Sequence, residues 1–354
     1  MGARPLKRAI DQYVVAPLAA MIVEKRFPAG DQFLFVRSDG EGIQVEFVDP
    51  DADAISEPAA PVTGPITHSA LASAILTPRG TPDEFQMLEA ECESVERRLG
   101  AAEWSDLKDL LTGEMSSPDF WNRPDRFGVL ARFALMDRVK SAVQTARTLR
   151  DRALRYSQSP RRYSAELNGR LALQLYLIRE GIRDAFDDAP VEVALTVEPV
   201  LEGSGDRPAT LKWCSELNAM YRAWAVKRRM QIRDLRSPNG SPRARDPILL
   251  VSGFGAHRVL SAEAGLHVFE PSEGAATRVV ARVRTEAVPL GPLSGAEEDN
   301  AIVLALNTAP RSNNVVRRYR EQPPLVRDAA GQWRTGRLDL VLGGAFDLLQ
   351  GVAG

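Results

Sequence analysis

The sequence predicts an α+β protein: a three-helix bundle or coiled-coil domain, then a domain in which one helix covers an antiparallel sheet, with a small helix-plus-hairpin module in front. Three segments between residues 83 and 188 repeat apolar residues at steps of three and four, the spacing of a buried helical face. After Pro190 the period changes to two, which is typical of strands. Residues 211–235 return to helical spacing, and their large residues form one apolar stripe: Trp213, Leu217, Met220, Tyr221 and Trp224. Because that stripe must be covered, we expect the second domain to be organised around it.

Residues 1–50 predict the N-terminal module. A helix begins near the N-terminus and is bent or interrupted at Pro17. Strand patterns at Gln32–Arg37 and Ile43–Val48 flank a polar turn and indicate a hairpin. Residues 51–82 are rich in Pro, Ala, Asp and Thr, which indicates a linker between two modules.

Residues 83–188 predict the helical domain. Apolar seams run through Asp83–Leu99, through 129–153 and through 167–186. A turn-like string, Ser-Ser-Pro-Asp-Phe-Trp-Asn-Arg-Pro at 116–124, separates the first two helices. Periodicity by itself is equally compatible with any three-helix bundle.

Residues 189–290 predict the sheet domain. One strand covers 191–201 and leads through Gly-Ser-Gly into the helix Leu211–Leu235. Further strands are expected at Pro247–Val251, Ala256–Ser261, Leu266–Phe269 and Thr277–Val288. In the last of these Arg278, Arg282 and Arg284 share the face opposite the apolar residues. Such a row can bind RNA phosphates, or it can be a solvated face balanced by nearby glutamates.

Composition excludes several classes of protein. The chain has 354 residues and a net charge of −2, so no global positive field indicates nucleic-acid binding. The two cysteines, Cys92 and Cys214, lie on or beside apolar helical stripes, which favours burial over a disulfide or a metal site. There is no signal-peptide core and no apolar run long enough to span a membrane, so we expect a cytoplasmic protein without a cofactor.

The first residues carry a specific motif, Gly-Ala-Arg-Pro-Leu-Lys-Arg-Ala-Ile at 2–10, followed by Phe-Pro-Ala-Gly-Asp-Gln-Phe-Leu-Phe-Val at 27–36. This pattern resembles the end of the C-terminal small domain of Clp-type AAA+ unfoldases of the ClpB/ClpC class. The resemblance implies that Arg4 corresponds to the arginine that reaches nucleotide phosphates. The sequence contains no Gly-x-x-x-x-Gly-Lys-Ser/Thr loop, so this chain alone is not expected to hydrolyse ATP. We expect either fusion to such an ATPase or interaction with one in trans.

Residues 83–350 carry a second set of motifs. They are Asp-Phe-Trp-Asn-x-Pro at 119–124, Met-Tyr-x-x-Trp-Ala at 220–225, Glu-x-Gly-Leu-His at 263–267, Arg-x-Tyr at 317–319, and Val-x-Asp followed by Arg-Thr-Gly at 326–336. In this order they resemble bacterial class I peptide chain release factors. The resemblance implies that residues 313–354 pack on the sheet domain. It also implies a ribosome or ribosomal RNA as partner.

Two features of active release factors are missing. The family places a domain containing Gly-Gly-Gln, which hydrolyses peptidyl-tRNA, where this chain has only residues 291–312, and that tripeptide occurs nowhere. The loop that reads stop codons in the family corresponds here to Pro271, Ser272, Glu273 and Gly274. Its altered residues, together with Glu270, place negative charge where messenger RNA would approach.

Three functions therefore compete. The first is a catalytically silent release-factor-like module that binds the ribosome or a translation complex and is linked to a Clp-type unfoldase. The second is a protein–protein adaptor or oligomerisation tail of such an ATPase, with no ribosome contact. The third, an active release factor, is disfavoured because a fold does not supply chemistry once its site is gone.

Overall fold

The computed structural model describes the backbone of Phe33–Ser38 and Ile43–Val48 and, with side chains, residues 70–156, 162–200, 207–235, 248–272, 278–292, 295–329 and 333–349. The chain divides into two compact units, Met1–Val62 with Pro292–Asn300, and Thr63–Gly291 with Ala301–Gly354. In the first unit β1 (Phe33–Ser38) and β2 (Ile43–Val48) pair antiparallel, which confirms the predicted hairpin. The predicted N-terminal helix lies outside the described residues.

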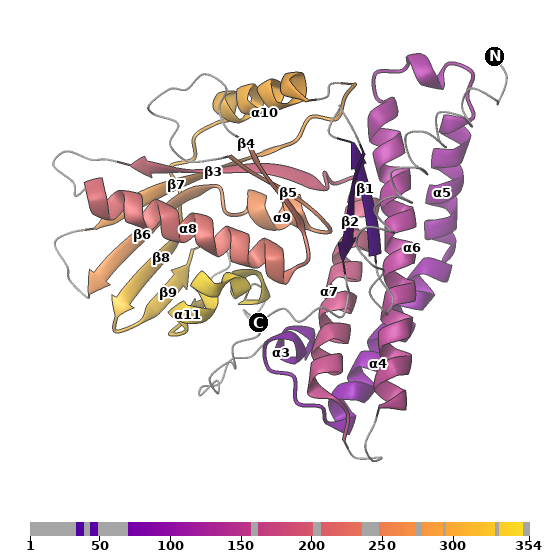
Figure 1. The fold of residues 1–354 in the computed structure, drawn as a ribbon, viewed down its shortest axis with the longest axis horizontal. Coiled ribbons are helices and arrows are strands. Elements are labelled where there is room, and N and C mark those ends of the chain that lie inside the picture. Colours follow the sequence, from indigo (N-terminus) through magenta and orange to yellow (C-terminus); the bar gives the residue numbers. More distant parts are fainter. Residues whose placement is uncertain are drawn as a thin grey trace. The chain divides into compact units, whose positions relative to one another are not determined.

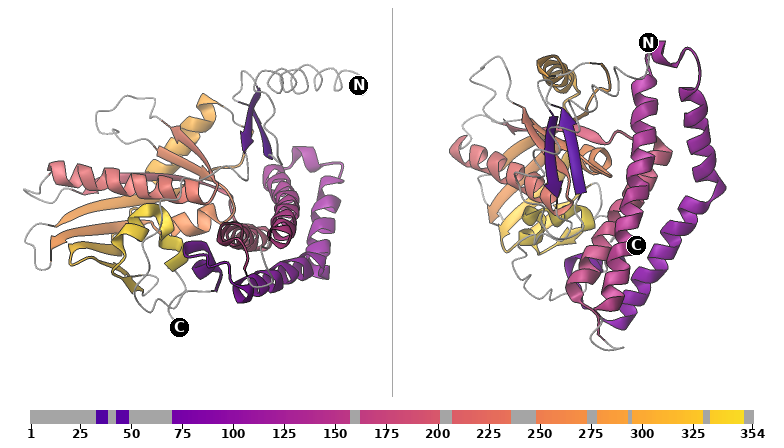
Figure 2. Two further views of the ribbon diagram at one scale, coloured as in Figure 1. Left: turned by 60° about the horizontal axis from the view of Figure 1, so that its bottom comes forward. Right: turned by 45° about the vertical axis from the view of Figure 1, so that its right-hand side comes forward.

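The helical domain contains more helices than the three predicted (Figures 1 and 2). They are α3 (Ala70–Leu76), α4 (Pro82–Gly100), α5 (Ala102–Met115), the short η2 (Phe120–Asn122), α6 (Arg126–Arg155) and α7 (Ala165–Asp187). The predicted seams are confirmed, because Leu88, Met136 and Ile182 are buried in one shared core. None of the described helices is long and apolar enough to cross a membrane.

Local capping explains where two of these helices begin. The Thr81 hydroxyl accepts a hydrogen bond from the Glu84 amide at 3.3 Å, and Pro82 takes the first helical position of α4, where no amide donor is needed. The Ser164 hydroxyl caps α7 in the same way through Leu167. The predicted linker 51–82 is wrong at its end, because α3 packs against α7 and so belongs to the helical domain.

The second domain contains an eight-stranded sheet with the order β10-β9-β8-β6-β7-β3-β5-β4. Its strands are β3 (Glu192–Val200), β4 (Gln231–Leu235), β5 (Ile248–Ser252), β6 (Gly265–Ser272), β7 (Val279–Ala287), β8 (Val315–Gln322), β9 (Leu325–Asp328) and β10 (Arg334–Thr335). All neighbours pair antiparallel except β6 and β8, which are parallel. The C-terminal strands β8, β9 and β10 thus extend the sheet.

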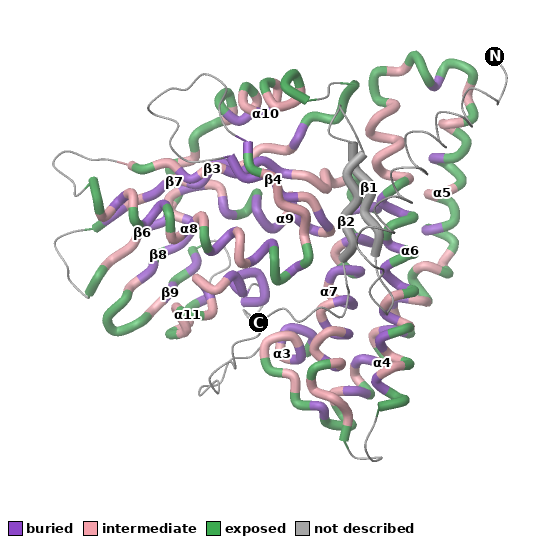
Figure 3. Tube along the Cα trace, viewed as in Figure 1, coloured by how far each residue is buried: buried purple, intermediate pink, exposed green. Residues whose placement is uncertain are grey.

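Helix α8 (Arg207–Lys227) lies along one face of this sheet (Figure 1). Its apolar stripe is buried as predicted, with Trp213, Tyr221 and Trp224 in the largest core cluster (Figure 3). The chain ends in α11 (Leu338–Leu340), η3 (Val341–Ala345) and η4 (Phe346–Leu349), whose Phe346 packs 5.9 Å from the Trp224 ring. The fold class predicted from the sequence is therefore confirmed.

The predicted C-terminus of the organising helix, at Leu235, is wrong. The helix ends at Lys227 because Arg229 adopts a left-handed conformation, φ 51°. The amide of Met230 then bonds to the carbonyl of Ala225, and that of Arg229 to Val226, a Schellman motif that normally uses glycine. The following residues, 231–235, form β4.

The strand predicted at Ala256–Ser261 is a helix, α9 (Ala256–Ser261). It begins at Gly255, φ 74°, whose amide donates to the Asp184 carboxylate of α7 at 2.5 Å. Arg258 also pairs with Asp184, at 2.6 Å, and with Glu180. These partners lie on α7, so the local sequence of residues 256–261 could not reveal them.

The interval predicted to stand in place of the Gly-Gly-Gln domain, residues 291–312, contains a helix, α10 (Ala296–Thr308). Its Ile302 and Leu306 are buried against Ala194, Leu250 and Val288, on the sheet face opposite α8 (Figure 1). Residues 301–308 therefore cover β3 and β5 instead of extending away from the sheet.

Candidate functional site

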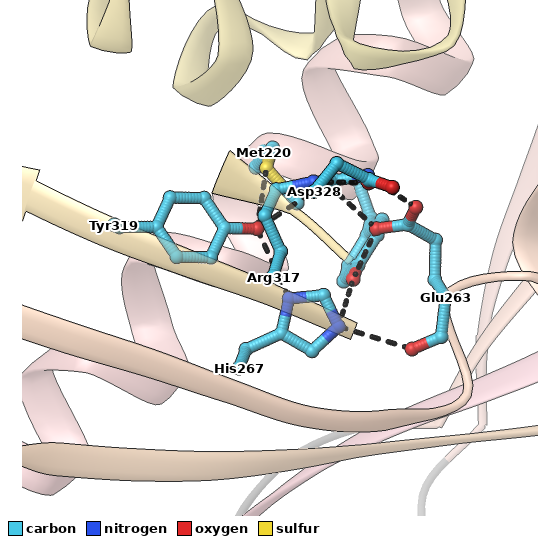
Figure 4. Close-up of polar contacts among 7 residues, drawn as sticks. Met220, Glu263, His267, Arg317, Tyr319 and Asp328 are labelled. Carbon is cyan, nitrogen blue, oxygen red and sulfur yellow. Dashed lines mark hydrogen bonds and ion pairs between the residues drawn. The ribbon is translucent and has the colours of Figure 1, made fainter. Parts of the chain in front are cut away.

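The release-factor-like motif residues of the sheet domain meet in one buried polar cluster, called the motif cluster here (Figure 4). Its members are Glu263, which follows α9, His267 on β6, Arg317 and Tyr319 on β8, and Asp328 on β9. All five are buried, and Tyr221 of α8 joins them from the opposite layer. Residues that lie up to 65 positions apart are thus brought together by the β9-β8-β6 pairing.

Arg317 occupies the centre of this motif cluster. Its guanidinium forms a two-pronged contact with Glu263, at 2.7 and 3.0 Å, and reaches Asp328 at 2.7 and 2.9 Å. The rings of Trp333 and Phe346 each lie 5.2 Å from it. A charge taken out of water needs such partners, because leaving it unpaired costs several kcal/mol, on the order of 3–5.

The hydrogen bonds of His267 admit one arrangement of protons. Its Nε2 lies 3.0 Å from the Glu263 carbonyl, which can only accept, so Nε2 carries the hydrogen. Its Nδ1, 3.0 Å from the Tyr319 hydroxyl, then accepts. The Tyr319 hydroxyl in turn lies 3.3 Å from Arg317 and can accept from it. The imidazole is therefore neutral and held in one tautomer.

Burial shifts the ionisation of the whole motif cluster. It lowers the pKa of His267 to about 3, and the nearby Arg317 charge acts in the same direction. Burial also raises the pKa of Glu263, against the opposing effect of Arg317. The pKa of Tyr221 is raised by burial and by the Glu263 charge. The cluster therefore consists of one buried cation with two acidic partners and neutral rings.

We expect acidification from pH 6.5 to pH 5 to cost about 1.6 kcal/mol of folding free energy through His267, since the slope approaches about 1.36 kcal/mol per pH unit once the unfolded histidine is protonated. The sign follows from the lowered pKa of the folded state: below about 6.5 the unfolded chain binds a proton that the folded chain refuses. Unfolding free energies of the native chain and of His267→Gln should therefore diverge in slope over this range. His257→Gln is the comparison variant. Burial also lowers the pKa of His257, but this residue lies outside the motif cluster, so the two variants separate the contribution of the cluster from that of another partly buried histidine.

A signal of His267 that titrates near pH 6.5 in NMR spectra of the folded native chain would contradict this assignment. That measurement is independent of whether His267→Gln folds.

The motif cluster holds the fold together; it does not contain an accessible reaction centre. Every member is enclosed between α8 and the sheet. Among the described residues no group of histidine, cysteine and acidic side chains could hold a metal ion. His267 is held among buried partners, and the pairing of Arg317 with Glu263 and Asp328 was missed by the sequence analysis. Their only signal in the sequence was membership of the family motifs.

The prediction that Arg278, Arg282 and Arg284 can together bind RNA phosphates is wrong for one of the three. Arg284 is buried at 3% exposure, where it pairs with Glu198 at 2.7 Å and donates to the carbonyl of Leu306 in α10. Arg282 points to the same face and contacts Asn313 at 2.8 Å. Arg278 keeps 59% of its side chain exposed and pairs with Glu270 at 3.1 Å. The helix that covers Arg284 lies outside β7, so the strand pattern could not predict it.

The segment predicted to correspond to the decoding loop, residues 271–274, is described only in part. Pro271 and Ser272 are exposed and complete β6, whereas Glu273 and Gly274 lie outside the described residues, as does Arg4. The negative charge predicted at Glu270 is paired, because its carboxylate lies 3.1 Å from Arg278 and 3.9 Å from Arg318.

The two domains of the larger unit are joined by buried ionic contacts. On one side Asp184 of α7 receives the Gly255 amide and Arg258. On the other, Asp347 receives Arg228 at 2.6 Å and the Tyr176 hydroxyl of α7 at 3.0 Å. Both carboxylates are almost fully enclosed, so these contacts fix α7 against the sheet domain.

Comparison with known proteins finds similarity to a family model and to solved structures. The family model for the C-terminal D2-small domain of ClpB protein matches residues 1–35. No curated protein matches the sequence. Among solved structures the fold is similar to RF2 of Thermus thermophilus, with 17% sequence identity, a TM-score of 0.40, and coverage of 74% of this chain and 97% of that one. Residues 1–35 are thus similar to the ClpB family, the first of the two families that the sequence motifs resemble.

Proposed function

We propose that this chain is a catalytically silent, release-factor-like module that binds the ribosome and is linked to a Clp-type unfoldase. The observation that carries the proposal is the motif cluster. Glu263, His267, Arg317, Tyr319 and Asp328 come from the family motifs and satisfy one another's hydrogen bonds. The motif residues of the sheet domain therefore form one connected network of buried hydrogen bonds.

Catalytic silence is proposed from the interval between β7 and β8. A release factor needs a separate domain there to reach the peptidyl-transferase centre, and residues 296–308 instead form α10. Ile302 and Leu306 bury this helix against the sheet, so it cannot extend outwards without exposing apolar surface.

A link to a Clp-type unfoldase is proposed from residues 1–35, which match the D2-small domain of ClpB. In such an arrangement the module would bring the motor to translation complexes. The adaptor without ribosome contact remains the second candidate, and Trp121 favours it. This indole is 67% exposed beside buried Phe120, and exposed tryptophans are frequent at protein interfaces.

We expect the protein to sediment with ribosomes at low salt and to release no peptide from ribosomes paused at a stop codon. Binding should weaken steeply with salt, because RNA contacts release counterions. Ribosomes without the protein and a functional release factor are the two controls. Peptide release above background would contradict catalytic silence. Absence of sedimentation at any salt concentration would favour the adaptor instead.

A further inference from the structure

Three arginines lie across β8, β9 and β10, the three strands at one edge of the sheet. Arg318 of β8 is the direct cross-strand partner of Arg327 in β9, and Arg327 is the partner of Arg334 in β10. Directly opposed residues of antiparallel strands project on the same face, with Cβ atoms roughly 4.5–5.5 Å apart. The three side chains, called the arginine row here, therefore lie side by side.

The arginine row lies on the face opposite α8. Side chains alternate along a strand. The chain neighbours Arg317, Tyr319 and Val326 all point into the core beneath α8. The members of the row are exposed, and Arg318 keeps 47% of its side chain in solvent. Helix α10 buries the same face farther along, over β3 and β5.

The arginine row carries uncompensated charge. Like charges directly opposed on neighbouring strands are destabilising. Among the described residues the one carboxylate that forms an ion pair with the row is that of Glu270, 3.9 Å from Arg318, and it is closer to Arg278 at 3.1 Å. Arg327 and Arg334 make no ion pair with any residue that the structure describes. A self-repelling row of this kind is stabilised when an external polyanion neutralises it.

We infer that the arginine row binds the phosphate backbone of folded RNA, which rests on the proposed function and gives the ribosome contact a location. Guanidinium groups match phosphate oxygens in two-pronged geometry. The large exposed apolar side chains among the described residues all lie outside β8, β9 and β10. The row therefore offers neither an aromatic platform for stacking single-stranded bases nor an apolar wedge for a membrane. Backbone recognition of double-helical RNA fits this surface.

The test compares two charge-matched triple variants of the full chain. The first replaces Arg318, Arg327 and Arg334 with glutamine. The second replaces three exposed arginines near the ends of α4 and α6 with glutamine: Arg97, Arg98 and Arg155. Both remove three positive charges, so an effect confined to the first depends on place and not on net charge.

Binding is measured to ribosomes and to an RNA duplex of about 20 base pairs, between about 50 and about 200 mM salt. The slope of log K against log salt is negative, and its magnitude should be smaller by about 3 in the row variant, about 1 for each phosphate that is no longer bound. The affinity of the row variant at low salt should be about tenfold lower or more. The control variant should bind like the native chain. Arg327→Gln alone should melt up to about 2 °C higher at low salt, because it relieves repulsion from both neighbours.

The possible failures are distinguishable. Ribosome binding that is equal in the two triple variants would overturn the arginine row and leave the proposed function standing. If the native chain binds the duplex but not ribosomes, and only the row variant loses duplex binding, the arginine row would stand and the proposed function would be overturned. Preference for single-stranded RNA or for anionic vesicles over the duplex would reject the assigned ligand. A lower melting temperature for Arg327→Gln would show that this arginine supports the fold, which contradicts the inference.

Discussion

Replacing Arg317 with methionine is expected to lower the free energy of unfolding by about 3–5 kcal/mol, the range for breaking one side of a buried ion pair. The substitution leaves the carboxylates of Glu263 and Asp328 enclosed without their cation. Chemical denaturation monitored by tryptophan fluorescence measures the loss. Arg318→Met is the matched control, because this next residue is 47% exposed, and it should change stability by less than about 0.5 kcal/mol.

A combined variant separates the pairing from the packing of Arg317. If Glu263→Gln and Asp328→Asn are added to Arg317→Met, the uncompensated charges disappear together. Most of the stability should then return, because fully neutralised buried pairs are often no less stable than the original. Equal losses for Arg317→Met and Arg318→Met would mean that the motif cluster does not stabilise the fold.

Replacing Trp224 with alanine is expected to cost about 3–5 kcal/mol, the range for deleting a buried large aromatic side chain. The indole is fully buried between the sheet and η4, where it packs on Phe346 at 5.9 Å. The backbone of Gly344 also lies close, since a Cβ there would come within 2.3 Å of the Trp224 amide nitrogen. The cavity left by alanine cannot collapse easily between two such rigid neighbours.

Val226→Ala is the control for Trp224→Ala. This residue lies two positions farther along α8 and is 62% exposed, so its loss should change stability by less than about 0.5 kcal/mol. Thermal melting of both variants tests the orientation of α8. A larger shift for Val226→Ala would mean that the stripe predicted from the sequence faces solvent.

Periodicity in the sequence was sufficient to predict the main elements. The stripe that contains Trp213 and Trp224, the strand from 191 and the helical seams are all confirmed. These predictions succeed because one buried face repeats at a fixed interval along the chain. The sheet, which is antiparallel except for the pairing of β6 with β8, followed from the same signal.

Two of the errors share one physical cause, which is a partner distant in the chain. Residues 256–261 were predicted as a strand, but Asp184 of α7 accepts a hydrogen bond from the Gly255 amide at the start of this helix, and Arg258 binds the same carboxylate. Arg284 was placed on the correct face of β7, but α10 covers that face. The end of α8 is a local exception, and it was missed because Arg229, and not glycine, takes the left-handed position.

The motif cluster and the arginine row were even harder to predict from the sequence. The motif cluster could be named only through the family resemblance, since nothing in the spacing of Glu263, Arg317 and Asp328 requires that they meet. The arginine row depends on the register of β8, β9 and β10, which pairs Arg327 with an arginine on each side. Register is a tertiary property, and three arginines scattered over 17 positions do not disclose it.

The parallel pairing of β6 with β8 has a consequence for the order of events during synthesis on the ribosome. Strand β8 docks beside β6 only after the intervening β7 and α10 have been made, and Asp328, Trp333 and Phe346 enclose Arg317 later still. Until then α8 has an incompletely covered apolar stripe. The helical segments can form as they emerge, whereas the sheet domain must wait for nearly its last residues, a delay typical of contacts between distant parts of a chain. A nascent chain stalled before residue 315 would therefore expose α8 and be a target for chaperones or proteases.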